Sequence, residues 1–322
     1  MLKVLFINIT LEQTFGLSPL SWYYRQGVGS ISAVLRKYSH ETALLVLTRF
    51  DEGRVSDVIE DFRPDLVAVS STSGTIGVAG KVIGFVHDRY GVPIVLGGVH
   101  ATVVPEEAVK IRGLFAVCVG EGEFPLLELC EQLDSGRLNF RVRNMWFVRR
   151  GRIVKNPIRD LMHDLDGLPF GDRSIFDYSE KVRKTGHVEV SAGRGCPYHC
   201  TICINHSLQE IYHNKGKFVR LRSVKNVLTE IEQLVCHYPG IKVINFYDET
   251  FTLNKRWLKK FCEAYRERIG ISFMCSTRID TLDKGIIRLM RHAGCTKIRV
   301  GIESGDDYIR QKIVKKRIRK SR

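Results

Sequence analysis

Short apolar runs alternate with segments of helical period along the first part of the chain. The runs that predict strands are "KVLFINI" (3–9), "TALLVL" (42–47), "DLVAVSS" (65–71), "PIVLGG" (93–98) and "FAVCVG" (115–120). Between them, Val28, Ile31 and Val34 form one helical stripe, and Ala79 and Ile83 belong to another. Strands that are apolar throughout and separated by helices indicate an α/β fold with a Rossmann-like, flavodoxin-like parallel sheet covered on both faces.

A second alternating series follows. Its predicted strands lie at about 187–192, 242–247, 271–276 and 296–302. A helix capped by Ser223 lies between the first two, and the next helix carries Trp257, Phe261 and a structural Cys262 on its apolar stripe. Four such units predict part of a (β/α) TIM-like barrel. We expect a first domain at 1–140, a hairpin and linker at 141–180, and a barrel domain at 181–322.

Small and hydroxyl-bearing residues follow three strands of the first sheet. They are Ser70, Ser71, Thr72, Ser73 and Thr75 after the third strand, Gly97, Gly98 and His100 after the fourth, and Gly120, Glu121 and Gly122 after the fifth. Open sheets of this kind bind ligands at the carboxyl ends of their strands, and glycine lets a flat ligand approach the backbone. Ordinary turn chemistry also uses Gly and Ser, so both interpretations stay open.

The cysteines carry a sharper signal. There are nine, an odd number, and three of them form the motif "CPYHCTIC" at Cys196, Cys200 and Cys203. In a reducing compartment, closely spaced thiolates favour a soft metal site over a disulfide. Zinc would need a fourth ligand, which His199 or His206 could supply. Three thiolates on a 4Fe-4S cube leave one iron open to a reactant.

The motif resembles the signature of radical S-adenosylmethionine (SAM) enzymes, and the resemblance covers nearly the whole chain. It implies that the three cysteines hold a 4Fe-4S cluster whose open iron chelates SAM, which is cleaved to a 5′-deoxyadenosyl radical. The residues that it assigns to SAM are Tyr198 and Ile202 in the motif, Asp248, Glu249 and Thr250 of "YDETF", Arg278 of "STRID", and Glu303 and Ser304 of "GIESG". The family usually has an aromatic residue where Ile202 stands.

The three small-residue loops, followed by a "LDGLPF" linker and the cysteine motif, are similar to the cobalamin-binding branch of this superfamily. That branch implies bound cobalamin, a flavodoxin- or ferredoxin-type electron donor and a small-molecule or natural-product substrate. Most members transfer methyl groups, while others catalyse cyclisation or rearrangement. No Asp-x-His-x-x-Gly motif is present and the first histidine is His40, so we expect no histidine cobalt ligand from the loop after the first strand.

Family barrels have about six strands and the predicted series has four, so we expect a truncated barrel with an unprotected edge strand that holds SAM poorly. A cluster- and cobalamin-binding fragment without turnover is therefore an alternative. A tRNA methylthiotransferase would need three more cysteines in the first domain, where only Cys118 and Cys130 occur.

Charge and targeting signals add little to this picture. The net charge is +15, and the last thirteen residues contribute eight Lys or Arg and no acid. We expect a solvated basic tail, and no nucleic-acid partner. The first strand does not resemble a signal peptide and no apolar run is long enough to span a bilayer, which predicts a cytoplasmic protein.

Overall fold

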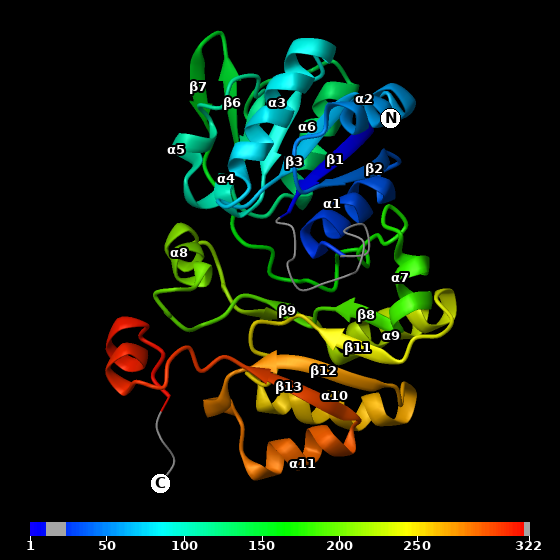
Figure 1. Ribbon diagram of the computed structural model, residues 1–322, viewed down its shortest axis with the longest axis vertical. Helices are drawn as coiled ribbons and strands as arrows, with labels where there is room; N and C mark the ends of the chain where they lie inside the picture. The colour runs from blue at the N-terminus through cyan, green and yellow to red at the C-terminus, as the bar shows by residue number, and fades with distance from the viewer. Residues whose placement is uncertain (11–23, 319–322) are drawn as a thin grey trace. The chain divides into compact units, whose positions relative to one another are not determined.

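The computed structural model describes residues 1–10 and 24–318. It divides into two compact units, one made of residues 1–160 and 168–178 and the other of 161–167 and 179–322. No helix among the described residues is long and apolar enough to cross a membrane. Figure 1 shows the elements of both units.

The first unit contains a seven-stranded sheet in the order β2-β1-β3-β4-β5-β6-β7. The first five strands are parallel, and β6 and β7 form an antiparallel hairpin that extends the sheet. The strands are β1 (Lys3–Ile9), β2 (Glu41–Leu47), β3 (Leu66–Ser70), β4 (Ile94–Gly97), β5 (Ala116–Cys118), β6 (Met145–Arg149) and β7 (Arg152–Lys155). The parallel order 2-1-3-4-5 is that of flavodoxin-like folds, which confirms the predicted fold class.

Helices cover both faces of this sheet because its strands are apolar throughout. The helices are α1 (Gln26–Lys37), α2 (Glu52–Phe62), α3 (Ile76–Tyr90), α4 (Val99–Val103), α5 (Pro105–Ala108) and α6 (Glu123–Asp134). Helices α1 and α6 contact each other, and so do α2 and α3. The core beneath α2 and α3 includes the fully buried Leu5, Val67 and Ile83. The carboxyl ends of β3, β4 and β5 are thereby fixed at one edge of the sheet.

The second unit contains a four-stranded parallel sheet in the order β13-β12-β11-β8. Its strands are β8 (His187–Val190), β11 (Val243–Phe246), β12 (Ser272–Thr277) and β13 (Cys295–Val300), and a short ribbon pairs β9 (Gly193–Arg194) with β10 (Arg220–Leu221). The helices are α7 (Tyr178–Thr185), α8 (Ile204–Ile211), α9 (Val224–His237), α10 (Lys255–Arg268) and α11 (Lys284–His292). Strand β13 is an edge strand of the sheet, as the sequence predicts.

Aromatic packing holds α10 against this sheet. Trp257 stacks on Phe261 with ring centroids 5.1 Å apart, and Phe261 meets Phe246 of β11 and Phe273 of β12 edge-on. The helix begins at the N-cap Asn254, whose side chain accepts the Trp257 N–H, just as Ser223 caps α9. The apolar stripe predicted for α10 therefore packs on β11 and β12 and holds these two strands in place. The candidate site residues lie at the carboxyl ends of the same strands.

Candidate functional site

The cysteine motif forms a loop between β9 and α8, and each of its three thiols has one polar side chain nearby. None of these three cysteines forms a disulfide bond. Cys196 Sγ lies 3.8 Å from Thr250 Oγ1, Arg278 Nη1 donates to Cys200 Sγ at 3.6 Å, and Asn205 Nδ2 donates to Cys203 Sγ at 3.7 Å. Burial raises the pKa of the Cys196 thiol. Because a hydrogen bond to sulfur strengthens when the sulfur is ionised, these neighbours favour anionic ligands.

This donor set fits an iron-sulfur cube better than a single metal ion. Among the described residues, no three His, Cys, Asp or Glu side chains lie close enough together to hold one ion. His199 and His206, the residues considered for zinc, face each other edge-on with ring centroids 5.7 Å apart. A cube binds each thiolate at a different iron atom, so its three cysteines need to surround a volume and not a point.

The backbone of the loop is held from α8. The Gln209 side-chain amide donates to the carbonyls of Cys196 and Tyr198 at 3.0 and 3.1 Å. The Cys203 N–H donates to the Cys200 carbonyl at 3.0 Å, and Cys203 is the N-cap of α8. These bonds fix the turns between the cysteines without using their side chains.

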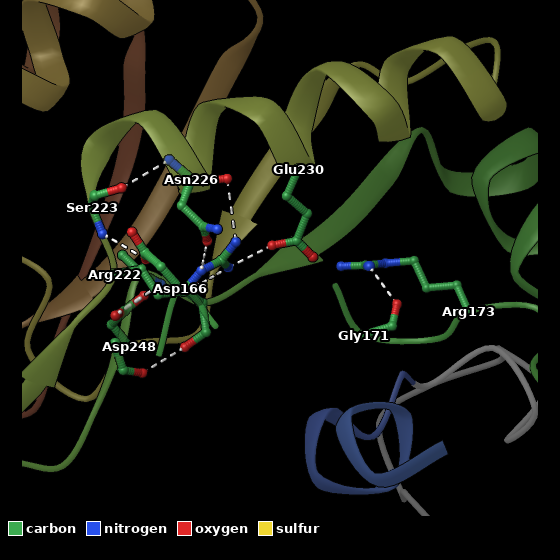
Figure 2. A network of polar contacts seen from close by, with 11 residues as sticks. Asp166, Gly171, Arg173, Arg222, Ser223, Asn226, Glu230 and Asp248 are labelled. Atoms are coloured by element: carbon green, nitrogen blue, oxygen red, sulfur yellow. Dashed lines mark hydrogen bonds and ion pairs between the residues drawn. The ribbon is translucent and has the colours of Figure 1, made fainter. Parts of the chain in front are cut away.

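A polar network fixes the chain just before the loop (Figure 2). The Ala192 N–H donates to both carboxylate oxygens of Asp248, at 3.1 and 2.9 Å, while the Ala192 carbonyl accepts from the Arg222 N–H at 2.8 Å. The Arg222 guanidinium donates to the Ser191 carbonyl at 2.8 Å and to Glu230 at 2.5 Å. The end of β8 is therefore held on two sides, and the cysteine loop begins from a fixed point.

The acidic loop after β11 divides its residues between two environments. Asp248 is buried with its carboxylate turned to Ala192, and desolvation raises its pKa to about 7. Glu249 is exposed, and partial desolvation raises its pKa although Arg194 and Arg220 act in the opposite direction. Thr250 is buried beside Cys196. Of the two acidic residues expected to meet the SAM amino group, Glu249 is the more exposed.

Arg278 is already engaged within the protein. Its Nε and Nη2 donate to Asp280 at 2.9 and 2.7 Å, and its guanidinium lies 3.7 Å from the ring centroid of Tyr198. The bidentate geometry predicted for the SAM carboxylate is used here for Asp280. Ile202 is 63% exposed and lies at the surface of the loop.

The segment after β13 corrects one prediction. We expected a solvated basic tail from residue 310, but Arg310 and Lys316 are buried, together with Val314 and Ile318. The π-helix Ile309–Ile313 (η3) brings this segment to Thr201, whose N–H donates to the Val314 carbonyl at 3.0 Å and whose hydroxyl donates to the Ile313 carbonyl at 2.7 Å. The overlooked signal was the recurrence of apolar residues among the basic ones, at 309, 313, 314 and 318.

Glu303 and Ser304 also have partners on this segment. Lys316 Nζ donates to Glu303 Oε1 at 2.8 Å, and Arg310 Nη1 donates to the Ser304 carbonyl at 2.9 Å. Glu303 has a positive φ of 70°. The loop after β13 is thus held by the basic segment that follows it, and the assignment of these two residues to SAM stays a prediction.

In the first unit, the structure brings the three small-residue loops together. The Thr75 hydroxyl accepts from the Thr72 N–H at 3.0 Å and lies 2.9 Å from the Ser71 hydroxyl. Gly98 has a φ of 93°, and a Cβ there would lie 2.7 Å from the Ser71 carbonyl oxygen, so only glycine fits. We call residues 70–75, 97–102 and 120–122 the small-residue rim.

The rim continues to the third loop and presents polar groups to solvent. Thr102 bridges the loops, because its hydroxyl donates to the Gly98 carbonyl at 2.9 Å and accepts from the Gly120 N–H at 3.0 Å. His100 Nδ1 lies 3.0 Å from the exposed Ser73 hydroxyl. The exposed face offers small residues flanked by hydroxyl and imidazole groups, which fits a large flat ligand. Glu121 and Gly122 follow at the start of α6, where Gly122 is the N-cap.

We predicted that no histidine from the loop after β1 binds cobalt, and most of that loop, residues 11–23, lies outside the described residues. His40 is buried, and its Nδ1 accepts the Leu2 N–H at 3.2 Å, which places it at the amino end of β1 and away from the rim. Burial lowers the pKa of His40. Cys118 and Cys130 are also buried, and desolvation raises the pKa of each to about 12, so they are packed thiols and not exposed ligands.

Sequence reasoning missed three polar residues, Asn205, Gln209 and Arg222. Each binds the cysteine loop or the strand before it. Asn205 and Gln209 lie on α8, soon after Cys203. Single amide side chains on a helix have no characteristic spacing, so no sequence pattern marks them. Arg222 stands directly before Ser223, the predicted cap of α9, and this position was the one sequence signal for it.

Comparison with known proteins assigns both units. Residues 190–322 match the model of the radical SAM superfamily, and residues 18–130 match that of the B12 binding domain. An uncharacterized methyltransferase of Pyrococcus horikoshii is 31% identical over 259 residues, which are 79% of this chain and 55% of the relative. The cytidylyl-2-hydroxyethylphosphonate methyltransferase of Streptomyces wedmorensis is 24% identical over 351 residues, covering 91% of this chain and 64% of the relative.

The fold is similar to that of a solved enzyme. The cobalamin-dependent SAM radical enzyme OxsB, solved with aqua-cobalamin and SAM bound, superposes with a TM-score of 0.78 at 20% identity, covering 98% of this chain and 46% of OxsB. The chain thus spans about half to two thirds of the length of these relatives. With a B12 binding domain followed by the cysteine loop on a parallel half-barrel, the chain belongs to the cobalamin-binding branch of the radical SAM superfamily.

Proposed function

We propose that this protein cleaves SAM reductively to a 5′-deoxyadenosyl radical and uses cobalamin to transfer a methyl group to an unactivated carbon of a small molecule. The observation that carries the proposal is the loop of three cysteines, each with its own polar neighbour, at the carboxyl end of a parallel sheet. The names of the two methyltransferase relatives favour methyl transfer over cyclisation or rearrangement. An acidic flavodoxin or ferredoxin would supply electrons.

Each cofactor has a proposed set of residues. Cys196, Cys200 and Cys203 would hold the 4Fe-4S cluster, and the small-residue rim would contact cobalamin. When bound, the cluster supplies the electron that cleaves SAM and cobalamin supplies the methyl group. Gln209 and Arg222 keep the cysteine loop in place, so that the thiols are already positioned before the cluster binds.

For SAM, we prefer some of the proposed contacts to others. We assign the SAM ammonium to Glu249, because it is an exposed residue whereas Asp248 is buried and its carboxylate accepts the Ala192 N–H. Arg278 would act mainly on Cys200, since its two other nitrogens already bind Asp280. Glu303 and Ser304 remain the proposed contacts to the ribose and methionine part of SAM.

The test begins with cluster assembly. The chain is reconstituted anaerobically with iron and sulfide as the wild type, as Cys196→Ala, Cys200→Ala and Cys203→Ala, and as the control Cys236→Ala, which removes an exposed cysteine on α9. Wild type and control should bind about four irons and show the electron paramagnetic resonance (EPR) signal of a reduced cube. The three loop variants should lose both. Equal loading of all five proteins would contradict the ligand assignment.

A second measurement tests turnover. With a chemical reductant and methyl-labelled SAM, the reconstituted chain should release 5′-deoxyadenosine, and the label should pass to cobalamin. A protein that binds both cofactors but releases no 5′-deoxyadenosine would refute the catalytic proposal and leave a cofactor-binding role. Passage of label to cobalamin separates methyl transfer from cyclisation or rearrangement.

A further inference from the structure

The second unit contains an open pocket outside the cysteine loop, with a volume of about 590 Å³. The described residues that line it are His163, Lys217, Val219, Arg220, Leu221, Leu253, Asn254, Lys255 and Arg256. Five of the nine are basic and none is acidic. The volume is in the range of small-molecule sites, so the pocket can enclose a ligand larger than a single ion.

The cations of the pocket differ in how they are held. Arg220 is buried, and its guanidinium donates to the Met162 carbonyl at 3.1 Å, so it is a fixed part of the wall whose charge also acts on Glu249. Lys255 forms an exposed ion pair with Asp283 at 3.1 Å, of the kind that contributes little to stability. Lys217 and Arg256 are exposed and form no hydrogen bond or ion pair within the described part of the chain. Two flexible cations can therefore turn toward a ligand.

The start of α10 adds positive potential to the same wall. Asn254 caps the helix, and the first turn carries Lys255 and Arg256 but no acidic residue. The amino end of a helix carries partial positive charge and normally attracts acidic side chains, so two cations there are unfavourable by themselves. An anion bound between the helix start and Lys217 would remove this repulsion and accept hydrogen bonds from both sides.

The pocket is built from segments that continue into the cluster loops. Arg220 and Leu221 form β10, which pairs with β9 immediately before Cys196. Leu253 and Asn254 follow the acidic loop that contains Glu249. The pocket lining thus includes residues that lie close in sequence to the two loops that we assign to the cluster and to SAM.

We propose that this pocket binds the phosphate group of a phosphorylated small molecule. Lys217 and Arg256 donate to the phosphate oxygens, the α10 amino end provides fixed positive potential, and Leu221 and Leu253 contact the organic part. Phosphate is favoured over a carboxylate because it accepts several charge-assisted hydrogen bonds at once, and the pocket offers cations from two separate segments of the chain. The site does not depend on the cluster or on cobalamin.

The test uses the whole purified chain and two probes, pyrophosphate and ADP, with binding followed by calorimetry at low salt. The variant Lys217→Gln/Arg256→Gln removes the two flexible cations. The control Lys259→Gln/Lys260→Gln removes the same charge from exposed positions later on α10. We expect the pocket variant to bind pyrophosphate roughly tenfold more weakly or worse, because charge-assisted hydrogen bonds are lost, and the control to bind as the wild type does. Far-ultraviolet circular dichroism should be the same for all three.

The two probes separate the sources of phosphate. Tighter binding of ADP than of pyrophosphate indicates that an organic part is recognised, and equal binding indicates the phosphate group alone; either result supports the proposal if the pocket variant weakens it. Equal binding by the two double variants, or no binding by the wild type, overturns it. If the wild type binds an acidic flavodoxin through these residues but neither probe, the surface is a protein-docking site and the phosphate proposal is wrong.

Discussion

Asp248 should make the stability of the second unit fall as the pH rises. The folded protein raises the pKa of this carboxyl from its ordinary value of 3.8 to about 7, mainly because the carboxylate is desolvated. At 1.36 kcal/mol per pH unit, this difference corresponds to about 4 kcal/mol. The unfolded chain loses the Asp248 proton first, so the folded state loses about 4 kcal/mol between pH 4 and pH 7 relative to a neutral side chain.

The substitution Asp248→Asn isolates this effect. The Asn amide oxygen can still accept the Ala192 N–H at 2.9 Å, but it does not ionise. Amide hydrogen exchange of β8 and β11, compared between wild type and variant at each pH, cancels the intrinsic pH dependence of exchange. The opening constant of the wild type relative to the variant should rise about fiftyfold from pH 5 to pH 7 and become level above pH 8.

The control for this experiment is Glu267→Gln, which removes an exposed carboxyl on α10 that has no hydrogen bond or ion pair among the described residues. Its ratio to the wild type should not change with pH. A ratio for Asp248→Asn that is equally flat would refute the reasoning, because it would mean that the folded Asp248 carboxyl titrates as it does in the unfolded chain.

Three further predictions concern the cofactors and the rim. Arg278→Gln removes a positive charge and a donor 3.6 Å from Cys200 Sγ, so the midpoint potential of the reconstituted cluster should fall by roughly 40 mV, equivalent to about 1 kcal/mol, in an EPR redox titration; an unchanged potential would contradict the contact. Gly98→Ala should destabilise the first unit by about 1–3 kcal/mol in urea unfolding, whereas Gly84→Ala, whose Cβ would meet nothing within 4 Å, should not destabilise it. If the loop after β1 supplies no histidine ligand, as we predict, the EPR spectrum of bound cob(II)alamin should be identical with natural and ¹⁵N-labelled histidine, and a changed nitrogen splitting would reveal a histidine on cobalt.

The sequence predicts the layers of the fold and the family well because both depend on local patterns. Continuous apolar runs place the strands of both sheets, and the spacing of Cys196, Cys200 and Cys203 indicates their ligand role without a structure. The direction of a side chain at a strand end depends on neighbours that are distant along the chain. Asp248 turns to Ala192, 56 residues away, and no local pattern predicts that.

Two other differences have causes of their own. Arg278 lies at the predicted strand end, but Asp280, two residues later, is positioned to take its bidentate hydrogen bonds. The segment at 309–318 contains enough charge to suggest solvent exposure, yet its apolar Val314 and Ile318 are buried. Net charge describes a segment as a whole, whereas burial is decided residue by residue.

The contact between Thr201 and residues 313–314 has a consequence for biosynthesis. Both hydrogen bonds that the Thr201 N–H and hydroxyl donate end on carbonyls more than a hundred residues later in the chain. During translation the cysteine loop leaves the ribosome long before those carbonyls exist, so its final conformation cannot form until that later stretch has been made. The thiols therefore spend part of synthesis in a loop that lacks these two hydrogen bonds.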